Sequence, residues 1–312
     1  MKKSSSKKRI LWSFNPFQND PKVLKNAVAL LKLLSKQTGL KVEPVYVVSP
    51  AEVNVVLEFS VPAKDRYQAV AQLECEKVLK KIQFPGLLPA TVLVENQVRL
   101  SASAKALAAY AEKTGAYALV IGTHGKSGLG RVLLGSFAET LLYHAKNPVL
   151  LVNPHLRAPA ALKHFLFASD FSPASRRAFG EFCAFLKPLK AKATLYHVVP
   201  KPFPWASPAT AYLLGTQTLN EAQYLREVAR ENLDKAEEFQ KVAKKAGVPC
   251  EVRLETSDED VAMAILRRVK GLKADGVGLA AQTGRWETAL LGSTSRGLLR
   301  EGRIPVWVLR AS

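Results

Sequence analysis

The segment IGTHGKSGLGRVLLGS, which spans Ile121–Ser136, combines a step typical of phosphate loops with a high density of glycines. Gly125 begins a Gly-Lys-Ser step, but a kinase-type phosphate loop needs another glycine five residues earlier, where this sequence has Val120. A dinucleotide-binding fingerprint needs its third glycine at the position of Leu133, so that motif is absent as well. The glycines therefore require another explanation.

The residues around this segment predict a strand, a glycine loop and a helix in succession. Leu119–Ile121 is an apolar run typical of a buried strand, and glycines after it let backbone N–H groups approach a phosphate without an intervening Cβ. Ser136 and Glu139 predict a capping box at the start of a helix, and a helix N-terminus favours anions. The segment thus predicts an anion site between strand and helix.

The composition favours a cytoplasmic protein of two domains. The chain has 312 residues and 48% hydrophobic content, and it contains no apolar run of about 18 residues that would predict a membrane span. Its basic N-terminus lacks the small-residue cleavage site of a secretory signal. Cys75, Cys183 and Cys250 are widely spaced, which argues against a disulfide scaffold or a zinc site and suits a reducing compartment.

The net charge of +19 favours anionic partners, such as nucleotides, nucleic acids or acidic proteins. Most lysines are scattered along helical stretches with glutamates nearby, and no stretch alternates aromatic residues with arginines as single-strand binders do. We therefore expect a solvated basic surface rather than specific nucleic-acid binding.

The chain repeats one order of elements twice. RILWSFNPF near the N-terminus and HFLFASDFS at His164–Ser172 are apolar runs that end in a polar turn and precede a helical stretch. Both halves close with a glycine–serine step, a helix and an apolar strand, which is NPVLLV at Asn147–Val152 and IPVWVL at Ile304–Leu309. Each repeat is long enough to be a whole domain.

We expect an α/β fold of two tandem doubly wound domains with helices on both faces of a parallel sheet. The strand-like runs are apolar throughout, as in sheets whose two faces are both covered. Each half also carries a long insertion between its second and its penultimate strand. The predicted boundaries are 9–153 for the first domain, 154–163 for a linker and 164–310 for the second domain. Ligands of such sheets bind at the carboxyl ends of the strands.

Gly122, Gly125, Gly135 and Ser136 form the pattern G-x2-G-x9-G-[S/T], which resembles the signature of the ATP-binding branch of the universal stress protein family. The resemblance extends over nearly the full chain, as a tandem pair. It implies a five-stranded parallel sheet in each half, an adenine nucleotide alpha hydrolase-like fold, and a loop that wraps the ribose and phosphates of ATP, with or without Mg²⁺.

In the first half, the resemblance implies an adenine-nucleotide site. Val47 matches the position whose backbone atoms read adenine, although its side chain is that of a plain core valine. Asn15 replaces a family aspartate near the ribose, and this change is expected to cost about 1 kcal/mol without abolishing binding. The expected nucleotide-binding residues are Asn15, Val47, Gly122, His124, Gly125, Lys126, Gly135, Ser136 and Phe137.

The second half keeps the aspartate but has a shorter loop. Asp170 stands where the family aspartate is expected, yet Ala281 replaces the first loop glycine and the loop is two residues short, so we expect weak or no ATP binding there. A purely structural role for Asp170, in a turn before a helix capped by Ser172, is equally open. The residues of this possible degenerate second site are Asp170, Val198, Gly284, Gly292 and Ser293.

The sequence offers no persuasive catalytic constellation. The five histidines lack metal-ligand spacing, and we predict neither catalytic residues nor a metal site. The resemblance implies an ATP-binding regulator or adaptor of the stress response, with at most slow hydrolysis and an unidentified protein partner. The alternatives are a ligand-free scaffold that binds protein or nucleic acid through its basic surface and, third, a nucleotidyl-transfer enzyme.

The last strands of the two halves are expected to pair with each other. Members of the family resembled here dimerise through their last strands, and in a tandem chain Asn147–Val152 and Ile304–Leu309 can pair within one molecule. We therefore predict an antiparallel pairing and an intramolecular pseudo-dimer, which would hide two otherwise exposed strand edges. Whether two chains associate further is left open by the sequence.

Overall fold

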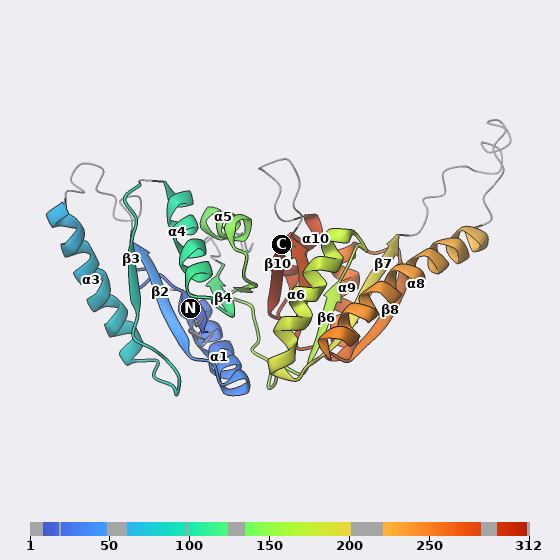
Figure 1. The fold of residues 1–312 in the computed structure, drawn as a ribbon, viewed down its shortest axis with the longest axis horizontal. Helices are drawn as coiled ribbons and strands as arrows, with labels where there is room; N and C mark the ends of the chain where they lie inside the picture. Colours follow the sequence, from blue (N-terminus) through green and yellow to red (C-terminus); the bar gives the residue numbers. More distant parts are fainter. Residues whose placement is uncertain are drawn as a thin grey trace, which may run out of the picture.

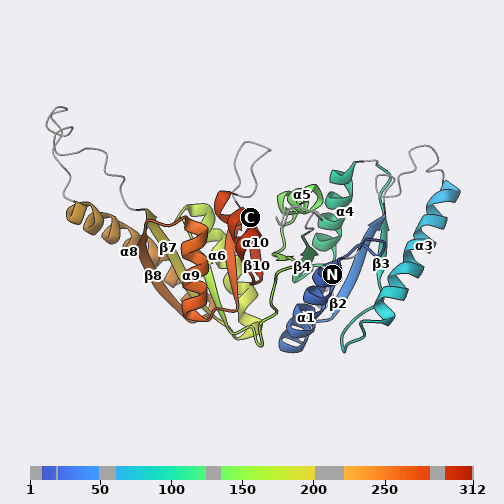
Figure 2. The same ribbon diagram turned by 180° about the vertical axis from the view of Figure 1, so that it is seen from behind.

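The structure is a computed structural model that describes residues 9–18, 20–48, 61–97, 99–123, 135–200, 221–281 and 292–310. The described residues form two α/β units that lie side by side, each with helices on both faces of its strands (Figures 1 and 2). This arrangement confirms the predicted fold class. Of the four loop residues His124, Gly125, Lys126 and Gly284, none is among the described residues.

The first unit is a parallel sheet of strand order β3-β2-β1-β4-β5. Because the order reverses between β1 and β4, the favoured ligand position lies at the carboxyl ends of these strands. Its elements are β1 (Ile10–Ser13), α1 (Pro21–Thr38), β2 (Val42–Val48), α3 (Val61–Lys80), β3 (Thr91–Val94), α4 (Leu100–Lys113), β4 (Ala118–Gly122), α5 (Ser136–His144) and β5 (Val149–Val152).

The second unit repeats this topology, with strand order β10-β9-β6-β7-β8. Its reversal lies between β6 and β9, which places a second favoured ligand position at the corresponding edge. Its elements are β6 (His164–Ala168), α6 (Pro173–Leu189), β7 (Lys192–Pro200), α8 (Glu221–Ala246), β8 (Cys250–Ser257), α9 (Val261–Leu272), β9 (Gly276–Ala281), α10 (Ser293–Glu301) and β10 (Val306–Arg310).

Strands β5 and β10 pair antiparallel and join the two units into one ten-stranded sheet. In this register Leu151 lies opposite Val306, and Leu150 lies opposite Trp307. The pairing confirms the predicted pseudo-dimer within one chain. It also gives both strands a hydrogen-bonded neighbour on the side that would otherwise be an exposed edge.

The core occupies both faces of the sheet because the central strands are apolar on both sides. Strands β2 and β5 are buried along their whole length. Helices α1, α3, α6 and α8 pack on one face, and α4, α5, α9 and α10 pack on the other. The strands whose carboxyl ends form the favoured ligand positions are therefore packed by helices on both faces.

Two helix starts test the capping predictions. Ser172 is the N-cap of α6, its hydroxyl accepts from Ser175 N at 3.1 Å, and Pro173 follows as the first helical residue, as predicted. The capping box at Ser136 is wrong, because Ser136 is the first helical residue of α5 and Gly135 takes the N-cap position without a side-chain bond. Gly135 thus provides the extended backbone conformation of an N-cap, without a side-chain hydrogen bond.

Side chains from both halves close the junction between the units. Asn153 is 1% exposed, and its Nδ2 donates to the carbonyls of Leu299 at 3.1 Å and Gly302 at 3.0 Å. The Tyr117 hydroxyl donates to the carbonyl of Phe185, and the two rings stack with centroids 5.2 Å apart. These buried contacts fix the two units against each other.

Candidate functional site

The described residues of the expected first-half site converge at one edge of the sheet. Asn15 follows β1, Val47 lies near the end of β2, Gly122 ends β4, and Gly135–Phe137 begin α5. These strands are neighbours in a parallel sheet, so their carboxyl ends meet. The topology thus brings these sequence-predicted residues together, and the assignment of a ligand to them stays a prediction.

Asn15 holds the turn after β1. Its Oδ1 accepts from Phe17 N at 2.9 Å and from Gln18 N at 3.2 Å. Asp170 does the same after β6, where its Oδ1 accepts from Ser172 N at 3.0 Å. The two residues are therefore structural equivalents, and each has a polar group that these turn bonds do not use: an NH₂ group in Asn15 and a second carboxylate oxygen in Asp170.

The two described glycines of the first-half pattern differ in whether the surrounding atoms leave room for a Cβ. A Cβ at Gly122 would lie 2.7 Å from the Cγ1 atom of Val23, so packing of α1 against the strand end already requires a glycine there. A Cβ at Gly135 would meet no atom within 4 Å. Packing explains Gly122, whereas no described contact requires a glycine at Gly135, which serves as the N-cap of α5.

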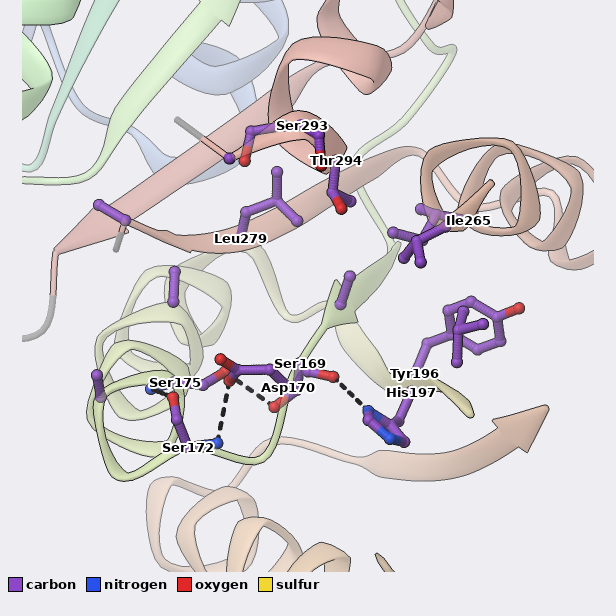
Figure 3. Close-up of a pocket in the computed structure, with 18 residues that line it drawn as sticks. Ser169, Asp170, Ser172, Ser175, Tyr196, His197, Ile265, Leu279, Ser293 and Thr294 are labelled. Atoms are coloured by element: carbon purple, nitrogen blue, oxygen red, sulfur yellow. Dashed lines mark hydrogen bonds between the residues drawn. The ribbon is translucent and has the colours of Figure 1, made fainter. Parts of the chain in front are cut away.

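A pocket of about 320 Å³ lies at the carboxyl edge of the second half (Figure 3). Four of the five residues of the degenerate second site line it: Asp170, Val198, Gly292 and Ser293. Its volume lies at the lower end of the range of about 300–1,000 Å³ typical of small-molecule pockets. The half with the shorter loop therefore has a formed cavity at the position that the topology favours.

One wall of the pocket is the N-terminus of α10. Gly292 is the N-cap, no side chain caps the helix within the described part, and the first intrahelical bond runs from Arg296 N to Gly292 O at 3.2 Å. The N–H groups of Ser293 and Thr294 precede that bond and have no intrahelical acceptor. Together with the two hydroxyls, they form an array of donors suited to an anion.

His197 lines the opposite side, near the end of β7. Its Nδ1 donates to the carbonyl of Ser169 at 2.8 Å (Figure 3). Its ring also packs on Phe171, with the ring centroids 4.6 Å apart. Burial lowers the pKa of His197, and this effect outweighs the opposing influence of the Ser169 carbonyl and of Asp170. The neutral imidazole therefore keeps an unprotonated Nε2, which is a hydrogen-bond acceptor.

Helix α9 forms an apolar wall through Val261 and Ile265 and is held by a charge network. Glu255 on β8 accepts from the Tyr196 hydroxyl at 3.0 Å and from Arg268 Nε at 3.0 Å, and it also pairs with Arg267. Burial alone would raise the pKa of Glu255, but these hydrogen bonds outweigh it and hold the pKa below its ordinary value. The ionised carboxylate thus ties α9 to the sheet.

Several lining residues were not predicted from the sequence. The polar ones are Ser169, Ser172, Ser175, Tyr196, His197, Thr294 and Ser295. His197 and Thr294 are direct neighbours of the predicted Val198 and Ser293, so a search of flanking polar residues would have found both. Ser169 directly precedes the predicted Asp170 and would have been found in the same way, whereas Ser175 reaches the pocket only through the fold.

The described residues hold no group of three or more His, Cys, Asp or Glu side chains that could bind a metal ion. None of the helices in the described part combines the length and hydrophobicity needed to cross a membrane. The pocket combines an apolar slot, one carboxylate and a helix N-terminus, which are features typical of small-molecule sites.

The fold defines a class: tandem doubly wound α/β domains that are paired through their last strands. The family model described as universal stress protein family matches residues 8–153 and 161–310. The chain therefore belongs to the universal stress protein family.

Individual relatives agree with this membership. Universal stress protein MJ0531 of Methanocaldococcus jannaschii is 31% identical over 122 residues, which cover 38% of this chain and 68% of the relative. A universal stress protein structure from Archaeoglobus fulgidus covers 99% of this chain and 100% of its own, with a TM-score of 0.61 and 18% identity. Protein PA1789 of Pseudomonas aeruginosa, described as functionally unknown, covers 98% of this chain and 94% of its own, with a TM-score of 0.54 and 15% identity.

Proposed function

We propose that this chain binds adenine nucleotides at the carboxyl edges of its sheets and acts as a ligand-dependent regulator or adaptor in the stress response. The observation that carries the proposal is the pocket beside Asp170, in which apolar walls face a helix N-terminus. A nucleotide needs these features together: a slot for the base, an acceptor for the ribose and donors for phosphate.

In the second half, each part of a nucleotide has a partner. The apolar side chains of Val198, Val261, Ile265 and Leu279 would enclose the base. The Asp170 oxygen that does not hold the turn would accept from a ribose hydroxyl. The N-terminus of α10 would receive a phosphate, because its leading N–H groups lack intrahelical acceptors.

The first half would use the same plan with a longer loop. Asn15 replaces the carboxylate by an amide, and Gly135 and Ser136 open α5 as Gly292 and Ser293 open α10. Mg²⁺ would enter with the phosphates of ATP rather than at a dedicated protein cage, since such sites bind it mainly through the substrate. We propose binding with at most slow turnover, as the resemblance to the family implies.

The proposal is tested by titrating a fluorescent ATP analogue into the full chain and into two variants at one position. Asp170→Ala removes both the ribose acceptor and the turn bond, whereas Asp170→Asn keeps a turn acceptor and copies Asn15. We expect Asp170→Ala to weaken binding in the second half about tenfold, and Asp170→Asn to weaken it less. If the parent and both variants bind ATP with equal affinity, Asp170 does not contact the ribose.

A further inference from the structure

Exposed lysines gather at the amino edge of the sheet, opposite the candidate nucleotide sites. Helices of a doubly wound domain run against the strands, so helix C-termini and strand starts share this edge. Lys77, Lys146 and Arg300 lie at this edge and pair with Glu74, Glu112 and Glu301. The exposed cations of the last helical turns and of the connections into the strands that have no ion-pair partner among the described residues are Lys36, Lys41, Lys80, Lys81, Lys113, Lys163, Lys187, Lys190, Lys244, Lys245, Lys270, Lys273 and Arg303. These are called the amino-edge cations below.

The amino-edge cations lack compensating acids. Of the residues that the structure describes, the acidic ones in these same turns and connections are Glu112, Asp275 and Glu301. Glu112 and Glu301 are already paired with neighbouring cations, and the carboxylate of Asp275 accepts from two main-chain N–H groups. None of the amino-edge cations has an ion-pair partner within the described part of the chain.

The opposite edge has a different character. Asp20, Glu95, Asp170 and Asp258–Asp260 stand in connections from strands to helices at the carboxyl edge. Within the described residues, these acids offset carboxyl-edge cations such as Lys22 and Arg99, whereas the amino edge keeps a surplus of positive charge. The surplus of positive charge faces away from the nucleotide sites, so those sites do not account for it.

Helix dipoles explain only part of this pattern. A lysine in the last turn, such as Lys36 or Lys187, is favourable at any helix C-terminus. Lys190 and Lys273, however, cap α6 and α9 in the left-handed region, at φ of 52° and 50°. Gly39 and Gly247 take that conformation after other helices, as the backbone prefers. Lysine thus occupies two positions where glycine would stabilise the fold.

The amino edges of both halves meet at the contact between α1 and α6. The main-chain N–H of the linker residue Leu162 donates to Gln37 Oε1 in the last turn of α1 at 3.0 Å. Tyr117, directly before β4, bonds and stacks with Phe185 near the end of α6. Helices α1 and α6 therefore contact each other at the junction, and their last turns carry Lys36 and Lys187.

We propose that the amino-edge cations bind the phosphate backbone of double-stranded nucleic acid. A surface of dispersed point charges suits the regular phosphates of a duplex, which are contacted without reading the bases. Single strands require exposed aromatic side chains for stacking. The exposed large apolar residues in the described part are Phe17, Val70, Leu73, Leu233 and Met263, and the aromatic one, Phe17, lies at the carboxyl edge.

The test measures binding of a labelled DNA duplex to the full chain by fluorescence anisotropy, between about 50 and 200 mM salt. The variant is Lys190→Gly with Lys273→Gly. It should lower affinity about eightfold for each lost phosphate contact at about 0.1 M salt and reduce the slope of log K against log salt by about 1.8. Its thermal midpoint should rise, because glycine relieves the left-handed caps, so a binding loss cannot reflect unfolding.

The matched control removes the same charge from the other end of a helix. Lys22 and Lys25 are exposed in the first turns of α1, and the double variant Lys22→Gln with Lys25→Gln should bind the duplex nearly as well as the parent. The proposal is overturned by equal losses in both double variants, which would indicate diffuse net charge. It is also overturned by no loss in either, by absent binding to the duplex, or by tighter binding to a single strand of the same sequence.

Discussion

His197 couples the second-half pocket to pH. Burial lowers its pKa below the usual 6.5, against the opposing influence of the Ser169 carbonyl and of Asp170, and Lys235 adds to the lowering. Because the folded-state pKa is below the unfolded one, the unfolded chain binds this proton more readily. The stabilising contribution of neutral His197 is therefore complete above about pH 6.5 and is lost as the pH falls through the folded-state pKa.

Replacing this ring should flatten the acid side of the stability profile. In His197→Asn, the amide Nδ2 can still donate to the Ser169 carbonyl, but the variant cannot take up the proton. We expect the variant to lose less free energy of unfolding than the parent between about pH 7 and pH 5.5, as measured by urea denaturation. His144 and His164, whose pKa values are also lowered, remain in both proteins as a common background. Parallel profiles for the two proteins would contradict the assignment.

The role of a single residue was predictable where its neighbours in the sequence determine it. The Ser172–Pro173 step specifies a helix start by itself, and the structure agrees. The predicted capping role of Ser136 was wrong because the preceding Gly135 adopts the extended conformation of an N-cap. Ser136 is therefore the first helical residue. His197 was missed because its partner, the Ser169 carbonyl, lies 28 residues away and is brought near only by the pairing of β6 and β7.

At the scale of elements, α9 depends on one carboxylate of β8. Glu255 joins Tyr196, Arg267 and Arg268 and is largely buried, with 15% of its side chain exposed. Glu255→Ala should lower the free energy of unfolding by about 1.5–3 kcal/mol, the usual range for hydrogen bonds to charged groups. Chemical denaturation of the full chain measures this loss.

Glu251 on the same strand provides the control. It pairs with Lys192 and Arg253, but 49% of its side chain is exposed. Glu251→Ala should change stability by less than about 0.5 kcal/mol, because solvent screens exposed pairs. If both substitutions cost the same, the network does not hold α9.

The edge strands could not be predicted from the pattern of apolar residues. The continuous apolar runs predicted the inner strands, which are buried on both faces. Strands β3 and β8 lie inside the segments that the sequence marked only as long insertions. As edge strands they lack that signal: β3 has four residues, and β8 is mostly exposed or half-buried along its length.

At the scale of the whole molecule, the repeated order of elements was enough to predict the paired arrangement. Apolar last strands in both halves need a partner, and β5 and β10 supply it to each other. Which of the two candidate sites has a formed cavity was less predictable. Loop length and glycine content favoured the first half, yet a cavity in the second half depends on how α9 and α10 pack around the strand ends. His124, Gly125, Lys126 and Gly284 stay predictions, because the described residues do not include them.

The central claim, nucleotide binding at the helix N-termini, can be tested at the two N-cap glycines. Gly135 and Gly292 have φ of −72° and −60°, a backbone that any residue adopts. Aspartate is a favourable N-cap, so Gly135→Asp and Gly292→Asp should preserve or strengthen α5 and α10. Each substitution nevertheless places a negative charge where a phosphate would bind.

The measurement is isothermal titration calorimetry of ATP with Mg²⁺ into the full-length parent, the two single variants and the double variant. The account predicts binding to the parent that is lost in the double variant, while the single variants show how much of it each half supplies. Absence of binding to the parent, or undiminished binding to the double variant, would contradict it.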